Sequence, residues 1–312
     1  MVNTLTLNPA MDKILYIDRF QRDITNRAKR QLLTVGGKGT HVSITLQKLG
    51  IRNRAFGFGY GRTGQTIIRA LEEQGIETRF FYSDQDDRES RTNYVIIEEA
   101  HGSSTTVAER GVEPTAREVE WLLDSLERDT APSDALVLAG DASNFQDPLI
   151  YCRIMRRLKE KKARVFLDAS GPSLKRSLEE GPYLIKPNRD ELAELCGLAI
   201  QTDRDVLNAL KKLERYDIPV IAVSLGGDGS VVKMGGEIYR VKPPKIDAVN
   251  TAGCGDSFLS GILYGLEKGL ATEETLDYAT AVSAAAAAWS LSIGFDEALR
   301  DSLLHKAKIV KL

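Results

Sequence analysis

The sequence has no long apolar segment and almost no net charge. Its 312 residues contain no run of about 18 or more apolar residues, and no basic stretch leads into an apolar one as in a secretion signal. We therefore expect no membrane contact and a cytoplasmic location. Lys and Arg total 42 against 44 Asp and Glu, a formal charge of −2, which does not indicate a nucleic-acid partner.

Cysteine is scarce, and two common nucleotide-binding patterns are missing. The three cysteines, Cys152, Cys196 and Cys254, are an odd number without metal-ligand spacing, and we expect the first two to be small buried thiols. The P-loop pattern GxxxxGK[ST] occurs nowhere, and no GxGxxG opens the first predicted helix. Neither a P-loop nor a dinucleotide-binding first turn is therefore predicted.

The most informative segment that is present is VNTAGCGDS at residues 249–257. Residues 245–249 predict the start of a strand. The apolar residues that follow the segment recur at helical spacing, so Asp256 would lie at the start of a buried helix. Gly253 and Gly255 let successive backbone N–H groups turn toward one point, where the helix N-terminus adds about half a positive charge. This predicts an anion site. Asp256 beside it suits a base that takes a proton from a hydroxyl attacking a phosphoryl group, or equally a simple helix cap.

A second glycine-rich turn leads into a helix near the N-terminus. GGKGTH at residues 36–41 runs directly into an amphipathic pattern, and LNPAMD at residues 7–12 ends a short apolar strand before it. Lys38 lies in the turn, where a cation suits an anionic or hydroxyl-rich ligand. A second ligand-binding turn is therefore predicted.

Five segments, in this order, resemble the ribokinase-like, PfkB-type carbohydrate kinases, in the branch of 1-phosphofructokinase and tagatose-6-phosphate kinase. The resemblance spans nearly the whole chain. It implies ATP-dependent phosphorylation of a sugar phosphate, fructose 1-phosphate or tagatose 6-phosphate, with Mg²⁺ as cofactor. The segments are TLNPAMD at 6–12, GGKG at 36–39, LIKPNRDEL at 184–192, VSLGGDGS at 223–230 and VNTAGCGDSF at 249–258.

Strand and helix patterns alternate along the chain and predict an α/β fold with a mostly parallel central sheet. The resemblance implies a ribokinase-like three-layer sandwich with a small β-sheet lid over the sugar site. Residues 12–33 and 90–108 are assigned to the lid, and residues 1–11, 34–89 and 109–312 to the nucleotide- and sugar-binding core. Buried strands are predicted at 2–7, 54–58, 135–139, 164–168, 183–185 and 220–224, and helices near 62–75, 115–128, 148–162, 189–196, 203–216 and 279–288.

The resemblance also implies roles for individual residues. Asp256 is the base, and the backbone of Gly253, Cys254 and Gly255 forms the anion hole. Cys254 takes a place that the family usually fills with Ala, and a helix N-terminus can lower the pKa of a thiol. The sugar side comprises Asp12, Gly37, Lys38, His41, Arg91 and Asp256, and the nucleotide side comprises Lys186, Asn188, Ser224, Gly226, Gly229 and Gly255.

Some of these assignments have an alternative. Asn188 and Glu191 are the implied Mg²⁺ ligands, partly through water, but the same pair suits a helix-capping arrangement, which the sequence alone favours. Arg91 would hold a phosphate already on the sugar together with Lys38, or lie on the lid as a surface charge. The turn at 224–229 is by itself a hairpin.

Departures from the family pattern concern the sugar. His41 stands where the branch has Asn, and Asp141 lies where the branch has a Ser-Gly-Ser-type turn. Because a carboxylate near a sugar phosphate is unfavourable unless paired, a different phosphosugar or an unphosphorylated sugar or polyol is the alternative substrate. The alternative to an enzyme is a catalytically weak, sugar-binding regulatory protein. By analogy alone, the resemblance suggests a homodimer formed through the lid.

Overall fold

A 10-stranded sheet crosses the middle of the protein in the computed structural model, which describes residues 1–85, 87–140 and 142–312. In sheet order its strands are β14 (Lys308–Lys311), β13 (Glu237–Lys242), β12 (Ser230–Met234), β11 (Val220–Ser224), β10 (Leu184–Ile185), β9 (Arg164–Asp168), β8 (Ala135–Ala139), β1 (Val2–Thr6), β4 (Asn53–Tyr60) and β5 (Glu77–Ser83). The strands from β11 to β5 are parallel, and β12 to β14 extend one edge with antiparallel pairing. A parallel strand covered on both faces needs a continuous apolar run, such as ALVLA of β8.

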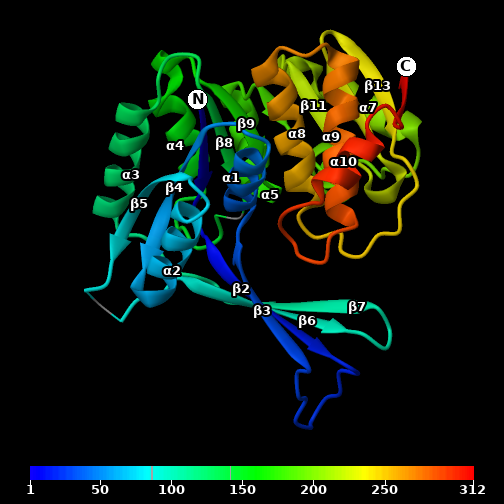
Figure 1. The fold of residues 1–312 in the computed structure, drawn as a ribbon. Helices are drawn as coiled ribbons and strands as arrows, with labels where there is room; N and C mark the ends of the chain where they lie inside the picture. Colours follow the sequence, from blue (N-terminus) through cyan, green and yellow to red (C-terminus); the bar gives the residue numbers. More distant parts are fainter. Residues whose placement is uncertain (86, 141) are drawn as a thin grey trace.

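Helices cover both faces of this sheet, which makes three layers (Figure 1). Alternate strand residues such as Leu136 and Val137 enter separate cores on opposite faces. None of the described helices is long and apolar enough to cross a membrane. One face carries α3 (Ala116–Asp129), α4 (Ile150–Arg157), α5 (Gly171–Ser177), α6 (Arg189–Cys196) and α7 (Asp203–Leu213), and the other α1 (Lys38–Lys48), α2 (Gly61–Glu72), α8 (Cys254–Lys268) and α9 (Thr272–Ala287), with α10 (Glu297–Leu303) packed on α9.

Small residues let α8 and α9 pack closely. A side chain at Gly261 would collide with the backbone of Ala279, and one at Gly265 would collide with Thr275. The alanine-rich segment predicted as a helix near 279–288 is confirmed, because it forms the second half of α9. This packing holds the first turn of α8 against α9, where the Ser283 hydroxyl donates to the Cys254 carbonyl oxygen at 3.0 Å.

A separate four-stranded sheet projects from the main body (Figure 1). Strands β2 (Ala10–Ile17) and β6 (Arg91–Glu98) pair in parallel at its centre, and β3 (Arg30–Gly36) and β7 (Ser103–Ala108) flank them antiparallel. Because β3 leads straight into α1, the small sheet is joined to the first glycine-rich turn. The predicted fold class, a mostly parallel three-layer α/β core with a small second sheet, is confirmed.

Three local predictions were wrong. Residues 245–249 form no strand, since the main-chain N–H groups of Val249 and Asn250 both donate to the carbonyl oxygen of Ala287, at the end of α9, at 2.8 and 3.0 Å. The helices predicted at 148–162 and 203–216 end early, at Arg157 and Leu213, and each is followed by a short 3₁₀ turn, at Lys159–Lys161 and Glu214–Tyr216. Further 3₁₀ turns lie at Leu178–Glu180 and Gly226–Asp228.

Candidate active site

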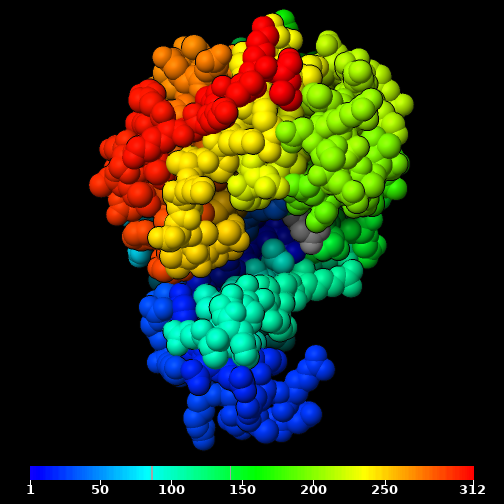
Figure 2. All heavy atoms as spheres, turned by 90° about the vertical axis from the view of Figure 1, so that its right-hand side faces the viewer, coloured from blue at the N-terminus to red at the C-terminus, as the bar shows by residue number. Residues whose placement is uncertain are grey.

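One cavity of about 1210 Å³ lies between the small sheet and the C-terminal half of the main body. Figure 2 shows its opening between the cyan strands of the small sheet and the yellow residues above them. Every residue that the sequence analysis assigns to the site lines this cavity, whereas Asp141 lies outside the described residues. The residues brought together are Asp12, Gly37, Lys38, His41, Arg91, Lys186, Asn188, Glu191, Ser224, Gly226, Gly229, Gly253, Cys254, Gly255 and Asp256.

Asp256 lies in the first turn of α8, as predicted, and Gly253 precedes the helix. Gly253 has φ of 77°, and any side chain there would collide with the carbonyl oxygen of Ser292, so only glycine fits. A Cβ on Gly255 would lie 3.1 Å from Nζ of Lys186. The first-turn amides of a helix have no intrahelical acceptor, and the helix dipole adds positive potential. This part of the wall can therefore hold an anion beside a carboxylate.

Cys254 is the first residue of α8 and is partly buried. Burial, and then the negative charge of Asp256, raise the pKa of its thiol to about 11. The expectation that the helix N-terminus lowers this pKa is therefore wrong, because desolvation outweighs the dipole.

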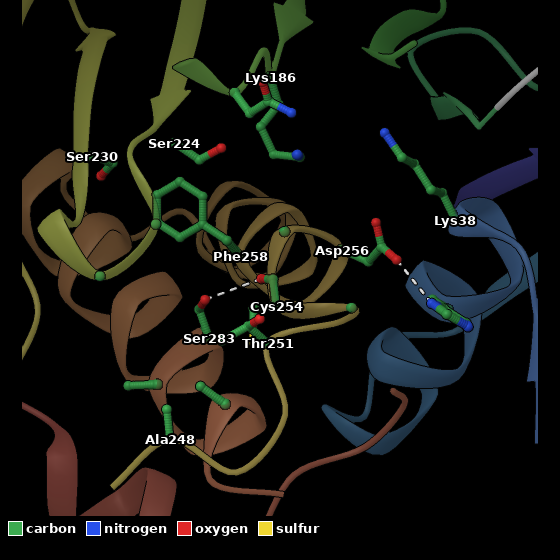
Figure 3. Close-up of a pocket in the computed structure, with 18 of the residues that line it drawn as sticks. Lys38, Lys186, Ser224, Ser230, Ala248, Thr251, Cys254, Asp256, Phe258 and Ser283 are labelled. Carbon is green, nitrogen blue, oxygen red and sulfur yellow. Dashed lines mark hydrogen bonds and ion pairs between the residues drawn. The ribbon is translucent and has the colours of Figure 1, made fainter. Parts of the chain in front are cut away.

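His41 makes two contacts instead of facing the cavity freely. Its Nδ1 lies 2.9 Å from Oδ2 of Asp256, and its Nε2 lies 3.1 Å from the carbonyl oxygen of Val35. Burial alone would lower the pKa of His41, but Asp256 and the nearby Asp12 raise it above its ordinary value. Figure 3 marks the contact to Asp256 with a dashed line.

A buried carboxylate joins two lysines of the site. Asp168, at the end of β9, places Oδ1 3.1 Å from Nζ of Lys38 and Oδ2 3.0 Å from Nζ of Lys186. Burial alone would raise the pKa of Asp168, but the two ammonium groups lower it below its ordinary value. Burial would likewise lower the pKa of Lys38, but Asp168, Glu191 and Asp256 raise it. Asp168 thus holds the ammonium groups of both Lys38 and Lys186 at the cavity wall.

Asn188 and Glu191 form the capping arrangement that the sequence favours. The Asn188 side chain accepts from the N–H of Glu191, and Oε2 of Glu191 accepts from the N–H of Asn188, each at 2.8 Å. This box starts α6 at the edge of the cavity. The other carboxylate oxygen, Oε1, lies 3.9 Å from Nζ of Lys38.

The small sheet contributes a carboxylate and a guanidinium to the cavity. Asn93 donates to Oδ1 of Asp12 at 2.7 Å, and a side chain at Gly36 would collide with the Asp12 carboxylate. Nε of Arg91 donates to the carbonyl oxygen of Asn8 at 3.0 Å. Arg91 therefore lines the cavity rather than lying on the outer surface of the sheet.

Glycine-rich backbone and small α9 side chains form the other end of the cavity. The turn between β11 and β12 is a hairpin connection, as expected, and a side chain at Gly229 would collide with the carbonyl oxygen of Val241. Arg189 and Asp228 brace this turn against α6 with an ion pair of 2.8 Å. The α9 residues that line this end are Thr280, Ser283, Ala284 and Ala287.

Sequence reasoning missed several polar residues of the site, among them Asn93 on the cavity wall and Asp168 behind Lys38 and Lys186. The only available signal for Asp168 was its position at the carboxyl end of a buried apolar strand, where ligand-binding residues collect in open α/β sheets. Asn93 carried no comparable signal, because its partner Asp12 is 81 residues away in sequence.

Known proteins resemble this chain over nearly its whole length. Residues 5–294 match the family described as pfkB family carbohydrate kinase. The 1-phosphofructokinase of Bacillus subtilis is 31% identical over 312 residues, which cover 100% of both chains. The tagatose-6-phosphate kinase of Staphylococcus epidermidis is 35% identical over 284 residues, which cover 90% of both chains. Phosphofructokinase-2 of Escherichia coli, solved with substrates and products, shares the fold with a TM-score of 0.91 at 21% identity, covering 98% of both chains.

Proposed function

Because the chain belongs to the pfkB family of carbohydrate kinases, we propose that it transfers the terminal phosphoryl group of ATP to a hydroxyl of a sugar phosphate. Fructose 1-phosphate and tagatose 6-phosphate are the leading acceptors, since relatives with those activities match nearly the whole chain. The observation that carries the proposal is the position of Asp256. It lies in the first turn of α8, on the wall of a cavity with cationic side chains at one end and glycine-rich turns at the other.

In this proposal the chain positions the reactants and neutralises charge, which is most of what phosphoryl transfer requires. Asp256 takes the proton of the attacking hydroxyl. The amides around Gly253 and Gly255 stabilise negative charge on the phosphoryl group in transit. Lys186 and Ser224, with the turn at 226–229, hold the nucleotide phosphates.

The residues present fit a hydrated Mg²⁺ ion. The capping box occupies Oε2 of Glu191 and the side-chain oxygen of Asn188, which leaves Oε1 of Glu191 on the cavity wall. The described residues contain no cluster of three or more His, Cys, Asp or Glu that could form a cage. Mg²⁺ needs no such cage, because it keeps several waters and binds largely through phosphates. Bound with ATP, it supplies neutralisation of the β- and γ-phosphate charge.

We propose that residues 12–33 and 90–108 act as the lid over the sugar, and that 1–11, 34–89 and 109–312 form the core. The support is that Asp12 and Arg91, from β2 and β6, line the cavity. Asp12 would bind sugar hydroxyls, and Arg91 and Lys38 would bind the phosphate already on the sugar.

The outer face of the lid would carry a homodimer contact. Leu33, Lys13, Tyr94 and Val107 occupy one row across the four strands, and the three apolar members of the row are exposed. Light scattering after size exclusion tests this. A dimer is expected for the wild type and a monomer for Leu33→Glu combined with Val107→Glu, and equal masses would reject the contact.

The activity is tested with Mg·ATP and a panel of phosphosugars, unphosphorylated hexoses and polyols, read as ADP release. We expect efficient turnover of fructose 1-phosphate or tagatose 6-phosphate, and a loss of several powers of ten in kcat for Asp256→Asn, with nucleotide binding retained. Asp124→Asn, an exposed carboxylate on α3, is the matched control. Binding of sugars without turnover would instead favour a regulatory protein, and wild-type turnover of Asp256→Asn would reject the base.

A further inference from the structure

The contacts of His41 determine where its protons lie. Nε2 is 3.1 Å from the carbonyl oxygen of Val35, which can only accept, so Nε2 carries a hydrogen. Nδ1 is 2.9 Å from Oδ2 of Asp256. A neutral ring protonated at Nε2 would turn a lone pair toward this carboxylate. One proton must therefore lie between Nδ1 and Oδ2.

The surrounding charges place that proton on the ring. Asp256 approaches His41 from α8 and Asp12 approaches it from β2, and both favour the imidazolium. Lys38, one turn earlier on α1, attracts the same Asp256 carboxylate. Burial alone would lower the pKa of His41, but the carboxylates raise it, so the ring stays charged to a higher pH than an exposed histidine.

We propose that His41 is a positioning residue for phosphoryl transfer, whose imidazolium holds Oδ2 of Asp256 so that Oδ1 faces the acceptor hydroxyl. This inference rests on the proposed role of Asp256 as the base. Figure 3 shows the second carboxylate oxygen of Asp256 pointing across the cavity toward Lys38. Because Val35 belongs to β3, His41 also ties the base to the small sheet that carries Asp12.

The arrangement makes turnover sensitive to alkaline pH. Below the raised pKa of His41 the imidazolium attracts Oδ2, and above it the lone pair on Nδ1 repels Oδ2. The carboxylate then loses its orientation, since no other hydrogen bond or ion pair among the described residues holds Oδ2. The rate constant kcat should therefore fall as the pH rises through this pKa.

The test measures kcat and KM against pH for wild type and three variants. His41→Asn places an uncharged amide donor at the position of Nδ1. The amide of His41→Gln lies farther along the side chain, at the position of Nε2, and His41→Ala removes both hydrogen-bonding groups. We expect His41→Gln and His41→Ala to lower kcat by about 10- to 100-fold while KM for both substrates changes much less. His41→Asn should lose the alkaline fall in kcat. His305→Asn, the same change at a side chain that is 88% exposed, should keep the wild-type profile.

Two outcomes of these kinetics would overturn the positioning role. One is a higher KM for the sugar with kcat unchanged, which would make His41 a substrate-binding residue, as the sequence resemblance implies. The other is an alkaline fall in kcat that persists in His41→Asn. If His41→Ala does not fold, the profile of His41→Asn decides alone.

NMR titration of the imidazole rings separates this inference from the proposed function. The chain has 3 histidines, so the signal missing in His41→Asn identifies His41. In Asp256→Asn the titration of His41 should move to lower pH. If it does not move although Asp256→Asn is inactive, the inference is overturned and the base assignment stands. If the His41 titration moves and Asp256→Asn retains full turnover, the assignment of Asp256 as the base is wrong, and the positioning role of His41 is wrong as well.

Discussion

Replacing Asp168 with asparagine should destabilise the protein far more than an ordinary loss of a surface charge. Asp168 is fully buried and forms ion pairs with two ammonium groups, at 3.1 Å for Lys38 and 3.0 Å for Lys186. The Lys38 side chain is 38% exposed and can turn to water, but that of Lys186 is 6% exposed and cannot. Removing one partner of a buried ion pair costs about 3–5 kcal/mol, because the other charge is left uncompensated.

The loss should also depend on pH in a defined direction. Burial alone would raise the pKa of Asp168, but Lys186 and Lys38 lower it in the folded protein. Its contribution to the free energy of unfolding is therefore present above the ordinary Asp pKa and disappears as the pH falls through the lowered value. The difference between wild type and Asp168→Asn should be full at neutral pH and shrink in strong acid.

Urea unfolding and thermal melts of wild type, Asp168→Asn and Asp124→Asn provide the assay. The control carboxylate is 61% exposed and pairs with Arg157 at 2.7 Å, so its removal should cost about 0–1 kcal/mol. The Asp168 variant should melt roughly 5–8 °C below the wild type, because an unfolding entropy of about 2.1 cal/mol/K per residue gives about 0.65 kcal/mol/K for 312 residues. A loss no greater than that of the control, or a loss that stays constant into strong acid, would refute the ion-triad argument.

Three further predictions concern the cavity. Lys38→Ala and Arg91→Ala should raise KM for a phosphorylated sugar and leave KM for ATP nearly unchanged, and an effect confined to ATP would show that the phosphate-binding assignment is wrong. Gly253→Ala should abolish turnover and lower the melting temperature more than Gly269→Ala does. Both glycines have positive φ, but only Gly253 is crowded by a main-chain oxygen, so equal melting temperatures would contradict this reasoning. Cys254, with its pKa raised to about 11, should resist alkylation at mildly alkaline pH in the native protein, as read by mass spectrometry, and rapid modification would show that the thiol is accessible as thiolate.

The sequence predicted those parts of the fold and site whose signal is local. Strands such as β8 are continuous apolar runs. The glycines at 253 and 255 indicate a turn at the start of α8. Each of these features depends on neighbours along the chain. The turns after β10 and β11 follow neighbouring parallel strands and so meet at one edge of the large sheet. The turn before α1 instead follows β3 of the small sheet, and the turn before α8 follows no strand.

The parts that could not be predicted depend on partners far apart in sequence. Lys38 and Asp168 are 130 residues apart, and His41 and Asp256 are 215 residues apart. Strand order decides such pairs, since β9 lies between β8 and β10 and no pattern in either segment states this. The edge strand β14 was missed for a related reason, because it is four residues long and half of them are lysines, a composition typical of protected sheet edges.

The position of β1 inside the large sheet, between β8 and β4, has a consequence for biosynthesis. Translation delivers β1 first, but its neighbours β4 and β8 follow only at residues 53 and 135. Until then the nascent chain carries β1, which is fully buried in the finished protein, with both edges unpaired, and unpaired strand edges can associate wrongly during synthesis. Asp256 leaves the ribosome later still, so a prematurely terminated chain would hold the Asp12 and Lys38 end of the cavity without the carboxylate proposed to drive the reaction. We therefore expect incomplete chains that lack Asp256 to have no kinase activity, and the newly made N-terminal third to be a client of ribosome-associated chaperones.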